Sequence, residues 1–244
     1  MISNKCSIIG ASHAGVSLAM HLRREGWIHE IELISDEAEL PYHRPPLSKE
    51  LLLGKRTFDQ IRLRPEKAFE DNGISLSLGK RVTAIDKQSK TLVFSDGEES
   101  NYGKLAICVG STINQISAGD NFKNVFYLRV AADVKKIQSL LFRNKQAVII
   151  GAGYIGLEVS AVLRQLGIEV TVVDIAKRVL ERVTSSHLSE WVRRLHEEHG
   201  VRFILETGVS EINGEERAES VVCTNGQILD CDMVFIGVGV TPNV

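Results

Sequence analysis

The sequence predicts an α/β fold that contains two similar nucleotide-binding units. Glycine-rich loops at residues 10–15 and 151–156 each follow a short apolar run and each precede a helical pattern. Such short apolar runs are typical of strands buried on both faces of a parallel sheet. The start of the helix after such a loop is an anion site that suits the pyrophosphate of a dinucleotide. The duplication therefore predicts two Rossmann-like units, each with a nucleotide site.

The second loop fits the dinucleotide pattern better than the first. It has all three glycines, Gly151, Gly153 and Gly156, whereas the first loop has Ser12 between Gly10 and Gly15. The glycines serve a tight turn, a close approach of the backbone to the pyrophosphate, and helix packing on the strand. Ser12 either crowds the pyrophosphate or donates a hydrogen bond to it, and a purely structural turn is the alternative for this loop. Further cofactor contacts are expected from His13, Ala14, Tyr154 and Ile155.

An acidic residue follows each glycine loop at the distance expected for a ribose ligand. Asp36 and Asp174 come after the next apolar β-type run, about 20 residues beyond their loops, where a carboxylate accepts hydrogen bonds from ribose hydroxyls. A carboxylate at this place repels a 2′-phosphate, so Asp174 favours NAD. The neighbouring cations Lys177, Arg178 and Arg182 keep NADP as an alternative.

The repeat extends beyond the loops. Asp96-Gly97 and Asn225-Gly226 are turn signals flanked by β-type residues, which predicts a hairpin in each unit. An apolar strand with a glycine at its end follows each hairpin, and the glycine lies 13 residues after the turn glycine in both halves. The shared register predicts a boundary near Ile113, with domains at residues 1–113 and 114–244.

Composition excludes several classes of function. The chain has 244 residues, of which 43% are apolar and 25% charged, and a net charge of -2, which gives no indication of nucleic-acid binding. No signal peptide or membrane span is expected, so the predicted location is cytoplasmic. The four cysteines and seven histidines show no metal-ligand spacing, and no metal is expected.

Residues 40–52 (LPYHRPPLSKELL) are too specific for a generic loop. Together with the two glycine loops, this segment closely resembles the flavin-containing ferredoxin and rubredoxin reductases of oxygenase systems, within the two-dinucleotide-domain flavoproteins. Residues 154–159, 178–183 and 237–243 match as well, so that the resemblance covers essentially the whole chain.

The resemblance implies that residues 1–113 belong to an FAD-binding domain and residues 114–244 form an NAD(P)H-binding domain. Hydride would pass between stacked nicotinamide and flavin rings. Arg44 and Pro45 would lie along the flavin, and the catalytic residues would be Lys49, near its reactive edge, and Glu158, paired with Lys49 across the two domains. The alternative for Lys49 is a surface lysine at a helix start, with Ser48 as the cap. Other matched cofactor positions are Val82, Gly110, Arg182, Gly237 and Gly239.

Residues 37–60 contain no cysteine, so the redox cysteine pair that related disulfide reductases carry after the flavin loop is absent. The expected function is therefore an NADH-dependent flavoprotein reductase that passes electrons through FAD to a small iron–sulfur protein, a ferredoxin or rubredoxin. One alternative is dinucleotide binding without flavin or turnover. Another is a flavin oxidoreductase of the same fold with a different electron acceptor.

In the family that the sequence resembles, the flavin domain resumes after the segment matched here by residues 239–243. The chain ends at Val244. The resemblance therefore implies an amino-terminal portion of a longer reductase, with the first unit incomplete.

Overall fold

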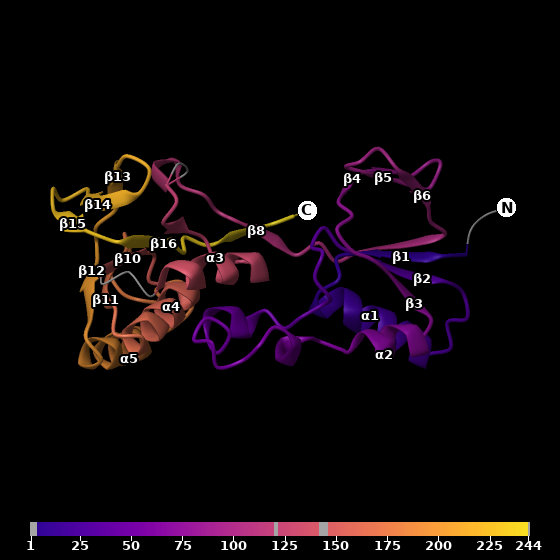
Figure 1. Cartoon of the computed structure of the whole chain (residues 1–244), viewed down its shortest axis with the longest axis horizontal. Coiled ribbons are helices and arrows are strands. Elements are labelled where there is room, and N and C mark those ends of the chain that lie inside the picture. The colour runs from indigo at the N-terminus through magenta and orange to yellow at the C-terminus, as the bar shows by residue number, and fades with distance from the viewer. Residues whose placement is uncertain (1–3, 120–121, 142–145, 244) are drawn as a thin grey trace. The chain divides into compact units, whose positions relative to one another are not determined.

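The computed structural model describes residues 4–119, 122–141 and 146–243. It confirms the α/β prediction, since the chain forms two compact units that each contain a parallel sheet (Figure 1). The first unit combines the residues up to His43 with Phe58–Ser111 and the residues from Pro242 onward, and the second combines Arg44–Thr57 with Thr112–Thr241. The sequence predicted a continuous division of the chain near Ile113. By contacts, however, the segment Arg44–Thr57 groups with the second unit.

The first unit contains a four-stranded parallel sheet in the order β3-β2-β1-β7. Its strands are β1 (Cys6–Ile9), β2 (Ile31–Ile34), β3 (Ile74–Ser77) and β7 (Lys104–Ile107). Its helices are α1 (His13–Arg24) and α2 (Glu66–Asp71). A second, antiparallel sheet consists of β4 (Val82–Asp86), β5 (Thr91–Phe94) and β6 (Glu99–Asn101). The apolar runs around residues 6–9 and 31–34 form strands because both of their faces are covered.

Two apolar clusters cover the two faces of this parallel sheet. On one face, Ile8 and Leu33 pack with Val16 of α1 and Phe69 of α2. On the other face, the buried side chains come from the parallel sheet and from the antiparallel sheet, and they are Ile9, Ile34, Leu92, Phe94 and Tyr102. The first unit therefore has three layers, with helices α1 and α2 on one side and β4–β6 on the other (Figure 1).

The second unit repeats this plan around a five-stranded parallel sheet in the order β12-β11-β10-β16-β9. Its strands are β9 (Val125–Phe126), β10 (Gln146–Ile150), β11 (Glu169–Val173), β12 (Val201–Ile204) and β16 (Met233–Ile236). Its helices are α3 (Ala131–Leu141), α4 (Tyr154–Gln165) and α5 (Ser186–Glu198). The antiparallel sheet consists of β13 (Val209–Gly214), β14 (Ala218–Cys223) and β15 (Ile228–Asp230).

The core of the second unit joins its parallel and antiparallel sheets. Val148, Ile150 and Val234 of the parallel sheet pack against Ile212 and Val221 of the antiparallel sheet. Helix α4 starts directly after the glycine loop, and one face of it is buried, with Leu157, Val162 and Leu163 among its buried residues. The predicted strand, glycine loop and helix are confirmed in both units.

Both predicted hairpins are present. The turn between β5 and β6 contains Gly97 at φ +83°, and the turn between β14 and β15 contains Gly226 at φ +85°. These are left-handed conformations that glycine adopts without a steric penalty. The remaining short elements are β8 (Ser111–Ile113), β17 (Val240–Pro242) and the 3₁₀ helices η1 (Pro45–Ser48), η2 (Asp59–Ile61) and η3 (Ser117–Gly119). Strands β8 and β17 pair with each other.

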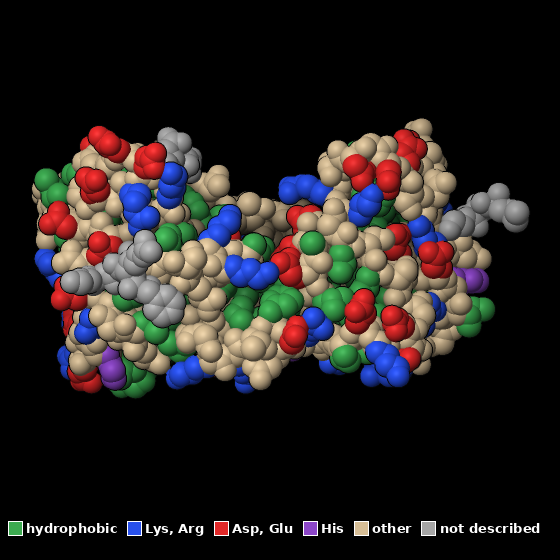
Figure 2. Space-filling model, viewed as in Figure 1, with side chains coloured by type: hydrophobic (Ala, Val, Ile, Leu, Met, Phe, Trp, Pro, Cys, Tyr) green, Lys and Arg blue, Asp and Glu red, His purple; other side chains and the backbone are tan. Residues whose placement is uncertain are grey.

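Charged side chains of both signs are interspersed over the face of each unit that Figure 2 draws. This distribution agrees with the net charge of -2. Within the residues that the structure describes, no helix combines the length and the apolar character needed to cross a membrane.

Helix α5 is attached to α4 through a partly buried histidine. Nδ1 of His196 lies 3.2 Å from Oγ of the buried Ser160, and the His196 ring packs on Phe203. Burial, together with the nearby His199, lowers the pKa of His196 below its ordinary value of 6.5. The folded chain therefore holds His196 neutral where the unfolded chain begins to bind a proton.

This shift predicts a pH-dependent stability of the second unit. The His196 contribution is fully present above about pH 6.5 and is lost as the pH falls through the lowered pKa, because the unfolded state then binds more protons. Thermal unfolding measured between about pH 7.5 and pH 5.5 should show a steeper fall of Tm in the natural chain than in His196→Gln. An equal dependence of Tm on pH in the two proteins would contradict the assignment of this pH dependence to His196.

Candidate dinucleotide-binding sites

The two glycine loops have the same backbone geometry. Gly10 has φ +107° and Gly151 has φ +111°, a region that side chains disfavour. A Cβ atom on Gly10 would lie 2.1 Å from the carbonyl oxygen of Cys108, and one on Gly151 would lie 2.5 Å from that of Gly237. Each loop thus passes directly over the residue that follows the neighbouring strand, and only glycine fits there.

The last glycine of each loop brings the helix against the strand. A Cβ atom on Gly15 would lie 1.9 Å from the carbonyl oxygen of Gly10, and one on Gly156 would lie 1.9 Å from that of Gly151. Both of these glycines are buried. The sequence therefore folds into a tight strand-loop-helix unit twice, with the first N–H groups of α1 and α4 directed out of the loop without partners in their own helices.

The middle of the second loop is open. Gly153 has no heavy atom within 4 Å of the place where a Cβ atom would stand. Its counterpart Ser12 makes no side-chain cap hydrogen bond to α1, and both residues have extended backbones. The hydroxyl of Ser12 is thus not committed to its own helix, and the space at Gly153 suits a close approach by a pyrophosphate.

A cleft of about 650 Å³ lies beside the second loop, within the second unit. Every cofactor residue predicted for this unit except Gly156 lines it: Gly151, Gly153, Tyr154, Ile155, Asp174, Arg182, Gly237 and Gly239. Gly156 lies behind the loop in the helix–strand contact described above. The structure therefore brings together residues from four separate stretches of sequence at the carboxyl ends of β10, β11 and β16.

Asp174 is held in place by the backbone. Its Oδ2 accepts a hydrogen bond from the N–H of Ala152 at 2.5 Å, and its Oδ1 accepts one from the N–H of Ala176 at 2.8 Å. Because Ala152 belongs to the glycine loop, the carboxylate and the loop keep a fixed distance. This arrangement places an acceptor for ribose hydroxyls beside the pyrophosphate loop.

The segment after β11 forms another wall of the cleft. The guanidinium of Arg178 donates to the carbonyl oxygens of Thr184 and Glu181, and the N–H of Leu180 donates to the carbonyl of Ala152. Arg178 is therefore used to hold its own segment. Arg182 is exposed to the cleft and, in the part of the chain that the structure describes, forms no ion pair, so its charge is available to an anionic ligand.

Several residues that line this cleft were not predicted from the sequence, among them Glu181, Thr207 and Gly208. Thr207 and Gly208 follow β12. Their place at the site could have been predicted from the order of the strands. In a parallel α/β sheet, ligands bind at the carboxyl ends of the strands, so that the loop after the next parallel strand is expected at the site.

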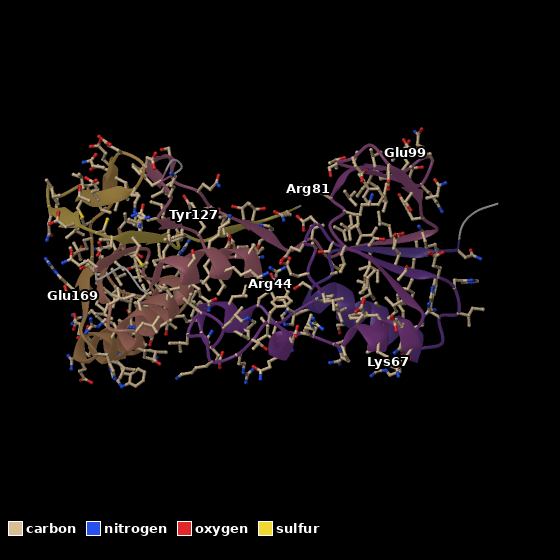
Figure 3. The ribbon with its side chains drawn as sticks, viewed as in Figure 1. Arg44, Lys67, Arg81, Glu99, Tyr127 and Glu169 are labelled. Atoms are coloured by element: carbon tan, nitrogen blue, oxygen red, sulfur yellow. The ribbon has the colours of Figure 1, made fainter. Side chains whose placement is uncertain are left out.

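In the first unit, Asp36 follows β2 as predicted and is exposed. Its carboxylate lies 3.6 Å from Nη1 of Arg81, which precedes β4 and is labelled in Figure 3. Arg81 was not predicted from the sequence as a site residue. The neighbouring Val82 packs into the cluster between the two sheets, and Gly110, after β7, has φ +66°.

Two histidines meet beside the first loop. His13 is the first residue of α1, and its Nε2 lies 3.2 Å from Nδ1 of His43. Ala14 is exposed next to it. Of the loop residues predicted for the first unit, His13 and Ala14 are exposed and Ser12 is partly exposed. Gly10 and Gly15 instead lie against backbone atoms.

The segment that carries Lys49 packs on helices of the second unit. Nη1 of Arg44, labelled in Figure 3, donates to the carbonyl of Arg129, and the Gln138 amide of α3 donates to the carbonyl of Leu51 at 2.7 Å. Pro45 is exposed at the start of η1. These hydrogen bonds explain why Arg44–Thr57 groups with the second unit.

Lys49 and Glu158 form an ion pair, with Nζ 2.6 Å from Oε1. By contacts both residues belong to the second unit, so the pair does not join two units as the resemblance implied. The helix cap in the alternative for Lys49 is not present, because Ser48 is the last residue of the 3₁₀ helix η1 and no helix begins directly after it, while the Lys49 side chain is 41% exposed. Instead, the Ser48 hydroxyl donates to Oε2 of Glu158.

Comparison with known families identifies the family of this chain. The model of the pyridine nucleotide-disulphide oxidoreductase family matches residues 4–244. The chain belongs to this family. Despite the family's name, the cysteines of this chain are at positions 6, 108, 223 and 231, and none follows the first loop in the segment 37–60.

The similar proteins in this family include electron-transfer reductases. The chain is 40% identical over 240 residues to the 5,5'-dehydrodivanillate O-demethylase ferredoxin reductase subunit of Sphingobium sp. strain SYK-6, covering 97% of this chain and 58% of that protein. It is 36% identical to putidaredoxin reductase of Pseudomonas putida, again covering 97% and 58%. The crystal structure of the covalent putidaredoxin reductase–putidaredoxin complex matches with a TM-score of 0.95 at 35% identity, covering 100% of this chain and 60% of that one. The chain thus spans less than two thirds of these relatives.

The loop geometry predicts different effects for two glycine substitutions. Gly153→Ala places its methyl group in open space, so the Tm should stay within about 2 °C of the natural chain, while NADH binding weakens at least about tenfold because the methyl group occupies the approach to the loop. Isothermal titration with NADH and thermal unfolding measure both effects.

Gly156→Ala is the matched control. Its methyl group would meet the carbonyl of Gly151, so this variant should lose several degrees of Tm as well as NADH binding. A Gly153→Ala chain that binds NADH as tightly as the natural chain would contradict the assignment of the open space to the dinucleotide.

Proposed function

We propose that the first unit binds FAD, that the second binds NADH, and that the chain belongs to a reductase which passes electrons from NADH to a small iron–sulfur protein. The observation that carries this proposal is the duplicated loop geometry, with Gly10 and Gly151 in the same backbone conformation and Gly15 and Gly156 in the same close contact. Two such loops in one chain provide for two dinucleotides. The names of the similar proteins support the type of reaction.

NADH suits the cleft of the second unit. The open space at Gly153 admits the pyrophosphate, and Asp174, held by two backbone N–H groups, accepts hydrogen bonds from the adenosine ribose. NAD is favoured over NADP because a fixed carboxylate repels a 2′-phosphate. Arg178 cannot compensate for this repulsion while its guanidinium holds the carbonyls of Thr184 and Glu181. Arg182 remains available to the pyrophosphate.

FAD suits the first unit. The backbone over Cys108 forms the tight turn, the uncommitted hydroxyl of Ser12 can donate to the pyrophosphate, and Asp36 is placed for a ribose. Bound FAD would supply the chemistry that side chains lack, because it accepts a hydride and releases electrons singly. The proposed contacts of Arg44, Pro45 and Val82 with FAD come from the resemblance.

Lys49 and Glu158 are proposed to balance the charge of the flavin during its reduction rather than to bind NADH. A lysine cation near a group that becomes anionic on reduction stabilises the reduced state, and a carboxylate partner offsets the cation beforehand. The ion pair in the free chain, with Nζ 2.6 Å from Oε1, supports this division of roles. With no cysteine in residues 37–60, no dithiol takes part at that place. A ferredoxin or rubredoxin as the electron acceptor and a cytoplasmic location are part of the same proposal.

Stopped-flow reduction of the FAD-loaded chain by NADH tests the proposal. Lys49→Ala should lower the limiting rate of flavin reduction at least about tenfold, because a positioned charge is lost, and should leave the Kd for NADH nearly unchanged. Asp174→Ala is the control with the opposite pattern. It should raise the Kd for NADH about tenfold or more, through loss of charge-assisted hydrogen bonds, with little change in the limiting rate.

The two variants therefore separate binding from reduction. If Lys49→Ala reduced its flavin at the natural rate, the role of Lys49 would be wrong. If Asp174→Ala bound NADH with unchanged affinity, the ribose assignment would be overturned.

A further inference from the structure

Glu158 has a second partner besides Lys49. The hydroxyl of Ser48 donates to Oε2 of Glu158, while Nζ of Lys49 lies 2.6 Å from Oε1 of the same carboxylate. Each oxygen of the carboxylate therefore has its own donor, and the two donors are consecutive residues of one segment. This arrangement is not a simple surface ion pair.

The side chains of Ser48, Glu158 and Lys49 differ in how exposed they are and in how many rotamers they can adopt. Ser48 is 2% exposed, whereas the side chains of Glu158 and Lys49 are 28% and 41% exposed. An exposed lysine–carboxylate pair alone defines its geometry poorly, because two long side chains lose rotamer freedom for a weak attraction. A buried hydroxyl with one short side-chain torsion is a much more rigid partner.

The backbone supports the position of Ser48. Ser48 is the last residue of η1, and the N–H groups of Lys49 and Leu51 both donate to the carbonyl of Pro46. Beyond η1, the Gln138 amide of α3 holds the carbonyl of Leu51. Ser48 is thus fixed by the turn on both sides, while Glu158 stands on α4, whose neighbouring residues Leu157 and Val159 are buried.

The hydrogen bond from Ser48 to Glu158 does not depend on the position of Lys49. A buried hydroxyl without a partner is costly, so the Ser48–Glu158 bond is favoured independently of the lysine. Glu158 then stays in one orientation with Oε1 free to receive Nζ. Among the residues that the structure describes, the other hydrogen bond of the Lys49 amine is a long one of 3.4 Å to the carbonyl of Pro45, and this contact cannot hold the amine alone.

We propose that Ser48 is a positioning residue, whose hydroxyl fixes the Glu158 carboxylate so that the Lys49 amine is held at one place. Its significance for electron transfer rests on the proposed function, but the positioning itself is a property of the free chain. It can therefore be measured without FAD or NADH.

The test measures the reactivity of the Lys49 amine. The free chain is treated with a limiting amount of an acetylating N-hydroxysuccinimide ester, and peptide mass spectrometry gives the acetylation rate of Lys49 relative to Lys67. Lys67 is an exposed residue of α2 in the first unit and serves as the internal reference (Figure 3). An amine held against a carboxylate reacts slowly, since the ion pair restricts its approach to the ester.

Ser48→Ala should raise the relative rate at Lys49 about threefold to tenfold, the range expected for the loss of one hydrogen bond. Ser48→Thr keeps the hydroxyl and should restore the natural rate. Ser48→Cys is close to serine in size but is a weaker donor, and it should give an intermediate rate without a change in packing. Glu158→Gln removes the carboxylate charge and sets the upper limit of the effect.

An unchanged Lys49 rate in both Ser48→Ala and Ser48→Cys would overturn the proposal. An equal rise in Ser48→Thr would also overturn it, because the hydroxyl would then be irrelevant.

A second readout links the positioning to the proposed function. In the FAD-loaded chain, Ser48→Ala should lower the limiting rate of flavin reduction about threefold to tenfold and leave the Kd for NADH unchanged. If the acetylation result holds and the reduction rate is unaffected, the positioning role stands and the proposed role of Lys49 in reduction fails. The two failures are therefore distinguishable.

Discussion

The constraint on which both nucleotide-binding loops depend is the contact between the last glycine of each loop and the carbonyl of the first. With only 1.9 Å between a hypothetical Cβ of Gly156 and the Gly151 oxygen, the start of α4 can lie against β10 only if no side chain is present. The same contact, between Gly15 and Gly10, places α1 against β1. Helix start, strand end and loop are therefore one rigid unit in each half of the chain, and their anion-binding N–H groups are held ready before any ligand arrives.

The other features of the second unit depend on this contact. Asp174 is tied to the loop through the N–H of Ala152, so the ribose acceptor moves only with the loop. Leu180 is tied to the carbonyl of the same residue, which fixes the wall of the cleft. Glu158 follows Gly156 by two positions on α4, so the ion pair with Lys49 is placed by the same helix that begins at the dinucleotide loop. The proposed dinucleotide loop and the proposed charge-compensating pair are therefore both positioned by helix α4.

The sequence was sufficient to predict the features that have local signatures. Apolar runs predicted β1, β10 and β11, the glycine spacing predicted both loops, and Asn225-Gly226 predicted a hairpin, because each depends on a few neighbouring residues. Contacts between distant residues had no such signature. Arg81 reaches Asp36 over 45 positions and Ser48 reaches Glu158 over 110, and these partners become visible only when the segments are folded. The catalytic roles of Lys49 and Glu158 remain predictions, although their ion pair is present.

The central question is whether one chain holds both dinucleotides in working form. The most direct measurement is the visible absorption spectrum of the purified chain after incubation with FAD and exhaustive dialysis, followed by anaerobic addition of NADH. The duplicated loops predict that FAD is retained in an equimolar amount and that its absorption bleaches with NADH. A colourless chain that still binds NADH would contradict the proposal, since it would leave a working site only in the second unit.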